Sequence, residues 1–434
     1  MLRSGAAGGS GVGPSGSGPT LKARPSRPDP DAKIAIVRWL LALSAVLAAV
    51  AASAVMPLTS SSPSADVVRL LRVPHDGIQP EAIAAADGVL HLLYFSGPPA
   101  SGNLFYVRSS DGGATFSTPL RVNSQDGSAV ATGTIRGGQL ALGRNGRVHV
   151  VWNGSDAALP KAPAAPSSGR PGFPLLYTRS NPEGTVFEAQ RGLIHHSYDL
   201  DGGGSITATA DGRVYAAWHG SPLDSVAGEE HRRVWLTRSD DDGKTFNDDA
   251  IAWKEPTGTC GCCGMRMLAG PASALVMLFR SASTPADRDV FVLASSDGGQ
   301  SFRGSRVQPW HIGSCPMTSM SLASAGNRVY GAWETAGQVS FGAIDMAGAT
   351  IPEPVAALGP GGTRKHPRLA VNPRGETMMV WTEGTAWARG GSMAWQVFDS
   401  SGRPTSQKGS QPGIPVWSFA STVSRPDGGF LIVY

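Results

Sequence analysis

Three stretches of the chain share one pattern: LFYVRSSDGGATF (Leu104–Phe116), VWLTRSDDDGKTF (Val234–Phe246) and FVLASSDGGQSF (Phe291–Phe302). In each, an apolar run ends in Ser-x-Asp-x-Gly-x-Thr/Ser-Phe. The Asp side chain can accept hydrogen bonds from N–H groups of its own turn, and the Gly supplies backbone freedom. The pattern therefore predicts a hairpin turn in which these residues have a structural role. The shared positions are Ser109, Asp111, Gly113, Thr115, Phe116, Ser239, Asp241, Gly243, Thr245, Phe246, Ser295, Asp297, Gly299, Ser301 and Phe302.

A second kind of hairpin recurs seven times around these turns. It consists of an apolar run, a polar turn that is often Asp-Gly or Asn-Gly, and a second apolar run that ends in an aromatic residue. A fourth, incomplete copy of the Asp-containing turn, SNPEGTVF (Ser180–Phe187), keeps the Ser, Gly and Phe but lacks the Asp. The seven hairpins are Ala82–Phe95, Leu140–Trp152, Ile206–Trp218, Leu268–Phe279, Leu322–Trp333, Leu369–Trp381 and Phe419–Tyr434.

The repeats predict an all-β fold. Two hairpins per repeat make a four-stranded sheet, and radial stacking of such sheets in a β-propeller buries both faces of each. The strand count gives six full four-stranded blades between about Ile78 and about Gly413. The segment Leu70–Gly77 is similar to the end of the first repeat, so it can pair with the C-terminal hairpin. We therefore expect a possible split seventh blade that is closed by both termini.

The turn motif resembles the Asp-box, or bacterial neuraminidase repeat, of the sialidase-like β-propellers. The CxCC segment at Cys260, with Trp-x-Ile-x2-Cys-Pro (Trp310–Pro316), resembles a bacterial subgroup that is often labelled exo-α-sialidase. The resemblance implies a glycoside hydrolase with three Arg for the substrate carboxylate, a Tyr nucleophile activated by Glu, and a carboxylic acid. The Arg-Ile-Pro motif of sialidases is missing, because the first blade reads IQPEAIAAADG (Ile78–Gly88).

Four charged residues are candidates for a catalytic or binding site at the mouth of the central channel. Alignment of the repeats brings Arg136, Arg266, Arg368 and Glu81 near the starts of the innermost strands, where propellers commonly bind ligands. Each arginine can equally be a loop or salt-bridge residue. No Tyr–Glu pair can be assigned, so the catalytic residues stay unknown.

The four cysteines lie in two clusters at the same place in adjacent repeats. Because Cys260, Cys262 and Cys263 precede one innermost strand and Cys315 precedes the next, all four are expected near the channel mouth. In an exported protein they predict a disulfide between Cys315 and one member of the other cluster. The alternative is a copper or zinc site with soft ligands. Its further candidate ligands are Met265, Met267, His311 and Met317.

The N-terminal region predicts export and membrane attachment. Residues 1–32 are basic and rich in Gly, Ser and Pro, which indicates a disordered cytoplasmic tail. Residues 33–58 contain a long uncharged apolar run, which predicts a transmembrane signal-anchor helix, and 59–65 form a linker. The propeller, 66–434, would then lie outside the cytoplasm of a bacterial cell, and cleavage would instead leave it secreted or periplasmic.

Three functions remain open at this level. The first is recognition of a glycan or another small acidic ligand at the channel mouth without proven catalysis. The second is an exo-α-sialidase type of glycoside hydrolase, and the third is an extracytoplasmic copper or thiol site. The net charge of +4 is small for 434 residues, so no nucleic-acid partner is expected.

Overall fold

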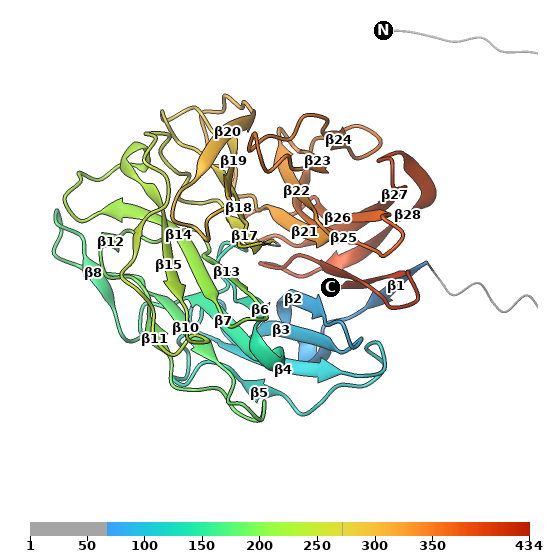
Figure 1. Cartoon of the computed structure of the whole chain (residues 1–434), viewed down its shortest axis with the longest axis horizontal. Coiled ribbons are helices and arrows are strands. Elements are labelled where there is room, and N and C mark those ends of the chain that lie inside the picture. The colour runs from blue at the N-terminus through green and yellow to red at the C-terminus, as the bar shows by residue number, and fades with distance from the viewer. Residues whose placement is uncertain (1–66, 271) are drawn as a thin grey trace, which may run out of the picture. The chain divides into compact units, whose positions relative to one another are not determined.

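The computed structural model describes residues 67–270 and 272–434, which form a compact all-β unit (Figure 1). Seven sheets follow one another around a central axis in chain order, so the fold is a seven-bladed β-propeller. The prediction of six full blades and a seventh closed by both ends of the propeller sequence is confirmed.

The first three blades take their strands in chain order from the axis outward. Their strands are β2 (Ile78–Ala84), β3 (Leu90–Ser96), β4 (Asn103–Ser109) and β5 (Leu120–Arg121); β6 (Gln139–Leu142), β7 (Val148–Asn153), β10 (Leu175–Arg179) and β11 (Arg191–Gly192); and β13 (Ser205–Ala208), β14 (Val214–Pro222), β15 (Arg233–Ser239) and β16 (Ala250–Ile251). Three short strands lie in the connections: β8 (Ala162–Ala164) and β9 (Pro171–Gly172), which pair with each other, and β12 (Ser197–Tyr198), which pairs with β14.

Blades four to six repeat this order. Their strands are β17 (Arg266–Ala269), β18 (Leu275–Arg280), β19 (Val290–Ser295) and β20 (Arg303–Gln308); β21 (Ser321–Ala325), β22 (Arg328–Thr335), β23 (Gln338–Ala343) and β24 (Val355–Ala356); and β25 (Arg364–Val371), β26 (Thr377–Glu383), β27 (Gly391–Phe398) and β28 (Pro404–Ile414). Three single 3-10 turns complete the described elements: η1 (Pro74–Asp76), η2 (Arg144–Gly146) and η3 (Glu229–His231).

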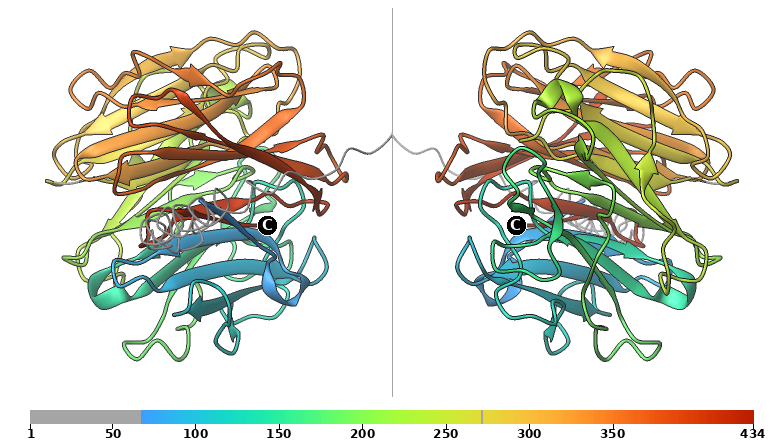
Figure 2. Two further views of the ribbon diagram at one scale, coloured as in Figure 1. Left: turned by 90° about the vertical axis from the view of Figure 1, so that its right-hand side faces the viewer. Right: turned by 90° about the vertical axis from the view of Figure 1, so that its left-hand side faces the viewer.

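The seventh blade joins the two ends of the propeller. Its strands are β29 (Ser421–Ser424), β30 (Phe430–Val433) and β1 (Val68–Leu71), and β1 pairs with β30 in parallel. Figure 2 shows the beginning of β1 and the last strands side by side. The Tyr434 N–H donates to the Leu71 carbonyl, and the Val73 N–H donates to the Tyr434 carbonyl, each at 2.9 Å. These bonds close the ring through the backbone, so closure does not depend on particular side chains.

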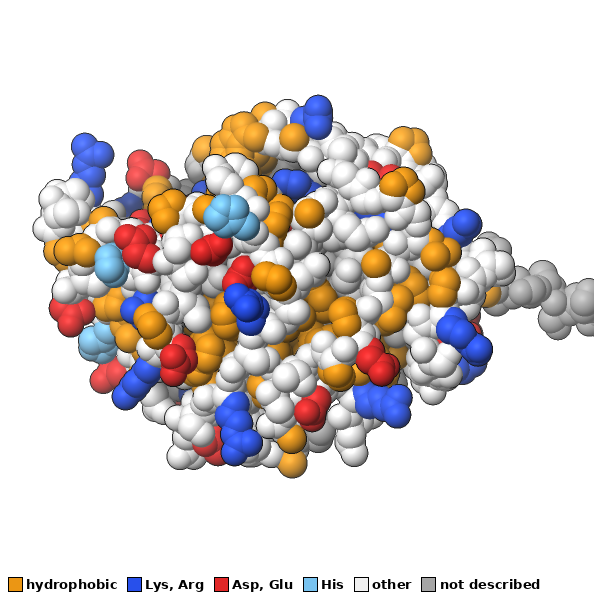
Figure 3. All heavy atoms as spheres, turned by 90° about the horizontal axis from the view of Figure 1, so that it is seen from above, with side chains coloured by type: hydrophobic (Ala, Val, Ile, Leu, Met, Phe, Trp, Pro, Cys, Tyr) orange, Lys and Arg blue, Asp and Glu red, His pale blue; other side chains and the backbone are white. Residues whose placement is uncertain are grey.

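Apolar side chains fill the spaces between the blades. The aromatic residues that end the second strands, such as Trp152, Trp218, Trp333 and Phe279, are at most 1% exposed. Burial of a side chain like Phe279 stabilises a fold by about 1.5–3 kcal/mol. On the face shown in Figure 3, acidic and basic side chains are interspersed with apolar ones and form no large patch of a single sign.

The Asp-containing turns form the same hydrogen bonds in each copy. The Asp111 carboxylate accepts from the Thr115 N–H at 2.9 Å and its hydroxyl at 2.6 Å, and the Ser109 hydroxyl accepts from the Gly113 N–H at 2.8 Å. The turns at Ser239 and Ser295 repeat these bonds. Gly113 has a φ of +89°, which an L-residue rarely adopts. The turns are thus closed by their own side chains.

These hydrogen bonds favour the ionised carboxylates. Bonds from Ser109 and Thr115 hold the pKa of Asp111 well below its ordinary value. At Asp241 partial burial opposes ionisation, but bonds from Thr245 and Ser239 outweigh it and lower the pKa to about 2. In the incomplete copy the Asn181 side chain accepts from the Thr185 N–H at 2.8 Å, so an amide oxygen takes the position of the carboxylate.

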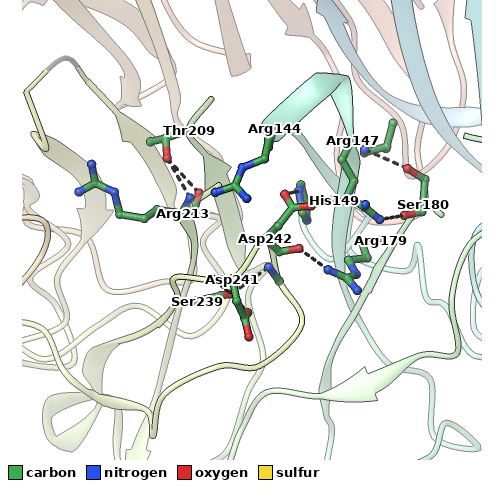
Figure 4. A network of polar contacts seen from close by, with 12 residues as sticks. Arg144, Arg147, His149, Arg179, Ser180, Thr209, Arg213, Ser239, Asp241 and Asp242 are labelled. Atoms are coloured by element: carbon green, nitrogen blue, oxygen red, sulfur yellow. Dashed lines mark hydrogen bonds and ion pairs between the residues drawn. The ribbon is translucent and has the colours of Figure 1, made fainter. Parts of the chain in front are cut away.

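A second polar network joins blades two and three near these turns (Figure 4). The Arg147 guanidinium pairs with the Asp242 carboxylate at 2.5 Å, and Arg179 donates to the Asp242 carbonyl at 2.6 Å. Behind them, the fully buried His149 ring hydrogen-bonds the Tyr177 hydroxyl at 2.9 Å. Burial lowers the pKa of His149 and keeps the ring neutral, so the network stabilises the contact between the blades.

The predicted cytoplasmic tail (1–32), signal-anchor helix (33–58) and linker (59–65) lie outside the described residues. Within the part of the chain that the structure describes, no helix is long and apolar enough to cross a membrane.

Candidate functional site

The innermost strands contribute one residue each to a ring around the axis. In every blade, this residue pairs with a residue of the second strand that comes directly before a buried aromatic residue. In blade two, for example, Gln139 pairs with Val151, and Trp152 follows Val151. We call these seven residues the hub ring; in chain order they are Glu81, Gln139, Ser205, Arg266, Ser321, Arg368 and Ser421. The ring therefore contains two cations, one anion and four neutral polar residues, although the strands that carry them are structurally equivalent.

The three charged members of the hub ring bind one another. Arg266 of blade four donates hydrogen bonds from both terminal nitrogens to the Glu81 carboxylate of blade one, at 3.0 and 2.8 Å. Arg368 of blade six approaches the same carboxylate at 3.3 Å and lies over the Phe419 ring. Burial raises the pKa of Glu81, and Arg266 opposes that rise. One carboxylate of the chain thus pairs with both guanidinium groups, while the buried Arg368 Nε has no hydrogen-bond partner.

One end of the propeller carries the segments that precede the innermost strands, and we call it the loop end. The hub ring is covered at this end. Ile135 packs there against the segments before blades three and four: a Cβ atom on Gly203 would lie only 2.0 Å from its carbonyl oxygen, and one on Gly264 would lie 3.6 Å from its side chain. The cavity between Ile135 and the two hub arginines has a volume of about 10 Å³, room for no more than about one water molecule. A sugar cannot enter at this point.

The channel continues on the other side of the hub ring, toward the box end, where the Asp-containing turns lie. A cavity of about 280 Å³ is lined there by all seven innermost strands, with apolar side chains such as Ile83, Leu142 and Leu268. Among its lining residues, and those of the small cavity above it, there is no tyrosine. The described residues therefore do not assemble the Tyr nucleophile and triple-arginine site that the sialidase resemblance implies.

Arg136 lies away from the other two candidate arginines, contrary to the expected cluster. Its guanidinium pairs with the Asp201 carboxylate and donates to the Thr132 carbonyl at 2.7 Å. The hub residue of this blade is Gln139, three residues after Arg136, so Arg136 is not equivalent to Arg266 and Arg368. The long segment before β6 allows Arg136 to lie above the hub ring and beside blade three.

Arg136 lines a larger pocket at the loop end, between blades two and three. This loop-end pocket has a volume of about 410 Å³. A second ion pair, Arg232 with Asp199 at 2.6 Å, lies in its lining. The charged, polar and aromatic residues that line it are Thr132, Arg136, Asn153, Ser155, Asp156, Phe173, Asp199, Asp201 and Arg232.

Two buried polar groups of the loop-end pocket have no hydrogen-bond partner. The Asn153 side chain is 2% exposed; its amide donates to the carbonyls of Asp201 and Gly202 at 3.0 and 3.1 Å, while its oxygen has no donor. Arg232 is 6% exposed, and one of its terminal nitrogens has no acceptor. A buried polar group without a partner is costly, so both atoms are suited to hydrogen bonds with ordered water.

Aromatic side chains are exposed at the loop end. Phe173, after β9, is 49% exposed and lines the pocket. Trp387 is 57% exposed, packs edge-on against Trp417 at 4.6 Å, and lies near Gly133, whose Cβ would be 3.5 Å from its ring. Exposed rings beside convergent polar groups are characteristic of ligand sites.

The two cysteine segments also meet at the loop end, between blades four and five. Cys262 and Cys315 form a disulfide, and Cys260 and Cys263 have free thiols. The Cys260 sulfur lies 2.9 Å from that of Cys263 and 3.5 Å from that of Cys262. The sulfurs of Cys260, Cys262 and Cys263 are close enough together to hold a metal ion.

The free thiols ionise unequally. At Cys263 burial opposes ionisation, but the Cys260 thiol and Arg280 outweigh it and lower the pKa. The hydrogen bond to Cys263 and burial both raise the pKa of Cys260. Cys263 is therefore the more acidic of the two thiols, and Cys260 donates the hydrogen bond between them.

The other proposed metal ligands have different neighbours. Met265 and Met267 pack in the apolar core between blades three and four. His311 is exposed and pairs with Asp287 at 3.0 Å. Met317, half-buried in the segment before β21, is not in the metal-binding group either. Among the described residues, that group contains cysteines alone.

Sequence reasoning missed most of the loop-end pocket. Asp199, Asp201 and Arg232 precede different strands, and no spacing connects them with Asn153 at the end of β7. One feature of the sequence does indicate this pocket. The Pro- and Ala-rich loop 157–172 of blade two directly precedes Phe173, and long loops often contribute to ligand sites.

Neither a protein-family model nor a curated protein matches the chain. Among solved structures, a Hadza microbial sialidase is similar over 71% of this chain and 64% of its own, with 13% identity and a TM-score of 0.46. The NanB sialidase from Streptococcus pneumoniae is similar over 71% of this chain and 65% of its own, with 11% identity and a TM-score of 0.45. The chain thus spans just under two thirds of the length of either sialidase.

A third similar structure is the α-L-arabinofuranosidase of Fusarium graminearum, with 12% identity and a TM-score of 0.47 over 71% of this chain and 88% of its own. The chain is a seven-bladed β-propeller, the architecture that the repeated turns indicated. At these identities the similarity concerns the fold, and it decides neither activity nor substrate.

Proposed function

We propose that this propeller recognises a neutral glycan in the loop-end pocket and does not hydrolyse sialic acid. The observation that carries the proposal is the pairing of every arginine near the axis with a carboxylate of the chain. Arg266 and Arg368 share Glu81, and Arg136 is paired with Asp201.

The charge of the pocket favours a neutral ligand. Its lining contains the aspartates Asp156, Asp199 and Asp201 but only two arginines. Both arginines are already paired with carboxylates, so an acidic sugar would meet one uncompensated carboxylate, and the one unpaired guanidinium nitrogen, on Arg232, is buried. Recognition of a carboxylate generally uses a free arginine fork, and like charges within a site oppose binding. The small acidic ligand considered from the sequence is therefore the less favoured choice.

The polar groups of the pocket suit the hydroxyl groups of a sugar. A hydroxyl can both donate and accept, so it can pair with the Thr132 and Asp156 side chains that line the pocket. The exposed Phe173 ring offers an apolar surface for the C–H face of a sugar ring. Convergent polar groups beside an aromatic surface fix both the orientation and the identity of a small ligand.

Binding is best tested with two oligosaccharides that differ only in a terminal sialic acid. Isothermal titration of the full chain should show binding of members of a neutral oligosaccharide panel and weaker binding of their sialylated counterparts. A fluorogenic sialoside should not be turned over. Preference for the sialylated member of a pair, turnover of the sialoside, or no binding across the panel would each overturn the proposal.

We also propose that the chain is exported and held at the cell membrane by residues 33–58, with the propeller outside. The basic residues before the apolar run Trp39–Leu58 and the absence of charged residues within that run support this orientation. Protease added to intact cells should then digest the propeller, which should remain with the membrane fraction after a high-salt wash. A propeller protected until the cells are lysed would contradict export, and one released into the medium or periplasm would indicate cleavage.

A further inference from the structure

The four cysteines lie at different depths. Cys315 is exposed, Cys262 is half-buried, and Cys260 and Cys263 are 1% and 2% exposed. Cys262 and Cys315 are joined in a disulfide, and the sulfurs of Cys262 and Cys260 are 3.5 Å apart. The outer pair therefore covers an inner pair of free thiols.

The number of free thiols selects the metal that could bind. Zn(II) in structural sites takes four protein ligands, which the inner pair cannot supply while the outer pair is oxidised. Soft thiolate ligands select Cu(I). Cys260 and Cys263 thus offer two soft ligands, a number suited to Cu(I) and too few for a structural Zn(II) site. Their sulfurs, now 2.9 Å apart, would have to separate to hold the ion between them.

The surroundings can neutralise the charge of such a site. One Cu(I) ion held by two thiolates has a net charge of −1, which is costly to bury unless a cation lies nearby. Arg280 interacts electrostatically with Cys263 and Arg288 with Cys260, and the carboxylates of Glu334 and Glu229 oppose these effects. Arg288 is paired with Glu229 at 2.6 Å, so Arg280 is the cation that can balance the ion. Arg280 is 2% exposed, and its Nε has no hydrogen-bond partner.

Arg280 is fixed in this position by several contacts. Its terminal nitrogens donate to the carbonyls of Arg288 and Glu334, and its guanidinium lies 4.8 Å from the Trp310 ring centroid. A cation that is buried and held in this way beside two thiols provides the compensating charge without rearrangement.

We propose that Cys260 and Cys263 bind one Cu(I) ion, with the Cys262–Cys315 disulfide covering its outer side and Arg280 balancing its charge. Two S–Cu bonds form, the protons that the two thiols carry pass to solvent, and neither copper nor sulfur changes oxidation state. The site lies between blades four and five, so it is separate from the loop-end pocket and does not depend on glycan recognition.

The test is a competition for Cu(I) between the full chain and bicinchoninate, under nitrogen, with ascorbate to maintain Cu(I). Mass spectrometry first establishes which cysteines are free. The wild-type chain should withhold about one Cu(I) per molecule and develop an ultraviolet thiolate-to-copper charge-transfer band. The Cys260→Ser/Cys263→Ser variant should lose both, and the Cys262→Ser/Cys315→Ser variant, which keeps the inner pair, should retain both.

Thermal unfolding of each variant identifies any loss of binding that is due to misfolding. A third variant, Arg280→Met, keeps both thiols and should bind Cu(I) at least 10-fold more weakly. Retention of copper by Cys260→Ser/Cys263→Ser would overturn the proposal. A Cys260–Cys263 disulfide in the isolated chain, or no copper withheld by the wild-type chain, would overturn it as well.

Discussion

The two ends of the propeller are built from the same blades but differ in how their residues are used. At the box end, the same side chains recur in turn after turn, and each turn satisfies its own hydrogen bonds, as between Asp111 and Thr115. At the loop end, the residues differ from one part of the ring to another: blade two contributes Asn153 and Phe173, and blades four and five contribute cysteines. The comparison indicates that repetition maintains the scaffold and that individual residues provide chemistry.

The hub ring is the strongest test of this comparison. Its charged residues are not repeated from blade to blade, yet they are buried like the residues of the scaffold. We expect Glu81→Gln to destabilise the chain by about 3–5 kcal/mol, since it leaves Arg266 and Arg368 near the axis without their carboxylate. Urea unfolding measures the loss. The exposed pair of Arg121 and Asp126 provides the control, and Asp126→Asn should cost no more than about 1 kcal/mol. Equal effects would mean that the hub ion pairs are not structural.

A substitution at the box end should affect stability alone. Ser239→Ala removes the hydroxyl that accepts from the Gly243 N–H at 2.8 Å, and leaving that buried donor unpaired should cost about 1–3 kcal/mol. Ser180→Ala, in the incomplete copy, should cost less, because the Ser180 hydroxyl accepts only a 3.2 Å bond from Val148. Unfolding curves of the two variants decide the order. The reverse order would contradict the role given to the complete turn.

A substitution at the loop end should affect binding alone. Phe173→Ala removes a half-exposed ring from the pocket, and affinity for the neutral oligosaccharide should fall about 10-fold, or about 1.4 kcal/mol. The melting temperature should not change. Val186→Ala, which truncates a 56% exposed side chain in a turn of the same blade at the box end, is the matched control and should leave affinity unchanged.

The smallest expected effect is a dependence on pH that belongs to the box end. The folded-state pKa of Asp241 is about 2, below its ordinary value of 3.8, so the folded chain favours the ionised form. This contribution is fully present above about pH 4 and is lost as the pH falls toward 2. The free energy of unfolding, measured with urea between pH 2 and 5, should change less with pH for Asp241→Asn than for the wild-type chain. An unchanged dependence on pH would show that the turn does not stabilise the carboxylate.

Much of the fold could be predicted because it is encoded locally. The period of the hairpins gave the blades, and the Asp-Gly turns marked where strands reverse. The parallel pairing of β1 with β30 was not predictable in detail, because strand direction depends on how the chain enters the ring. The candidate arginines were predicted less well: Arg266 and Arg368 meet at Glu81, but Arg136 lies in another pocket.

By itself, the sequence determined the repeating scaffold, since hairpins, turns and the alternation of apolar residues depend on neighbours along the chain. Only the tertiary structure decided which unlike residues share a space. Closing seven blades into a ring brings Glu81 to Arg266 across 185 positions, and Asn153 close to the ion pair of Asp199 and Arg232. Such contacts have no period, and their charges can be balanced only after the ring has formed.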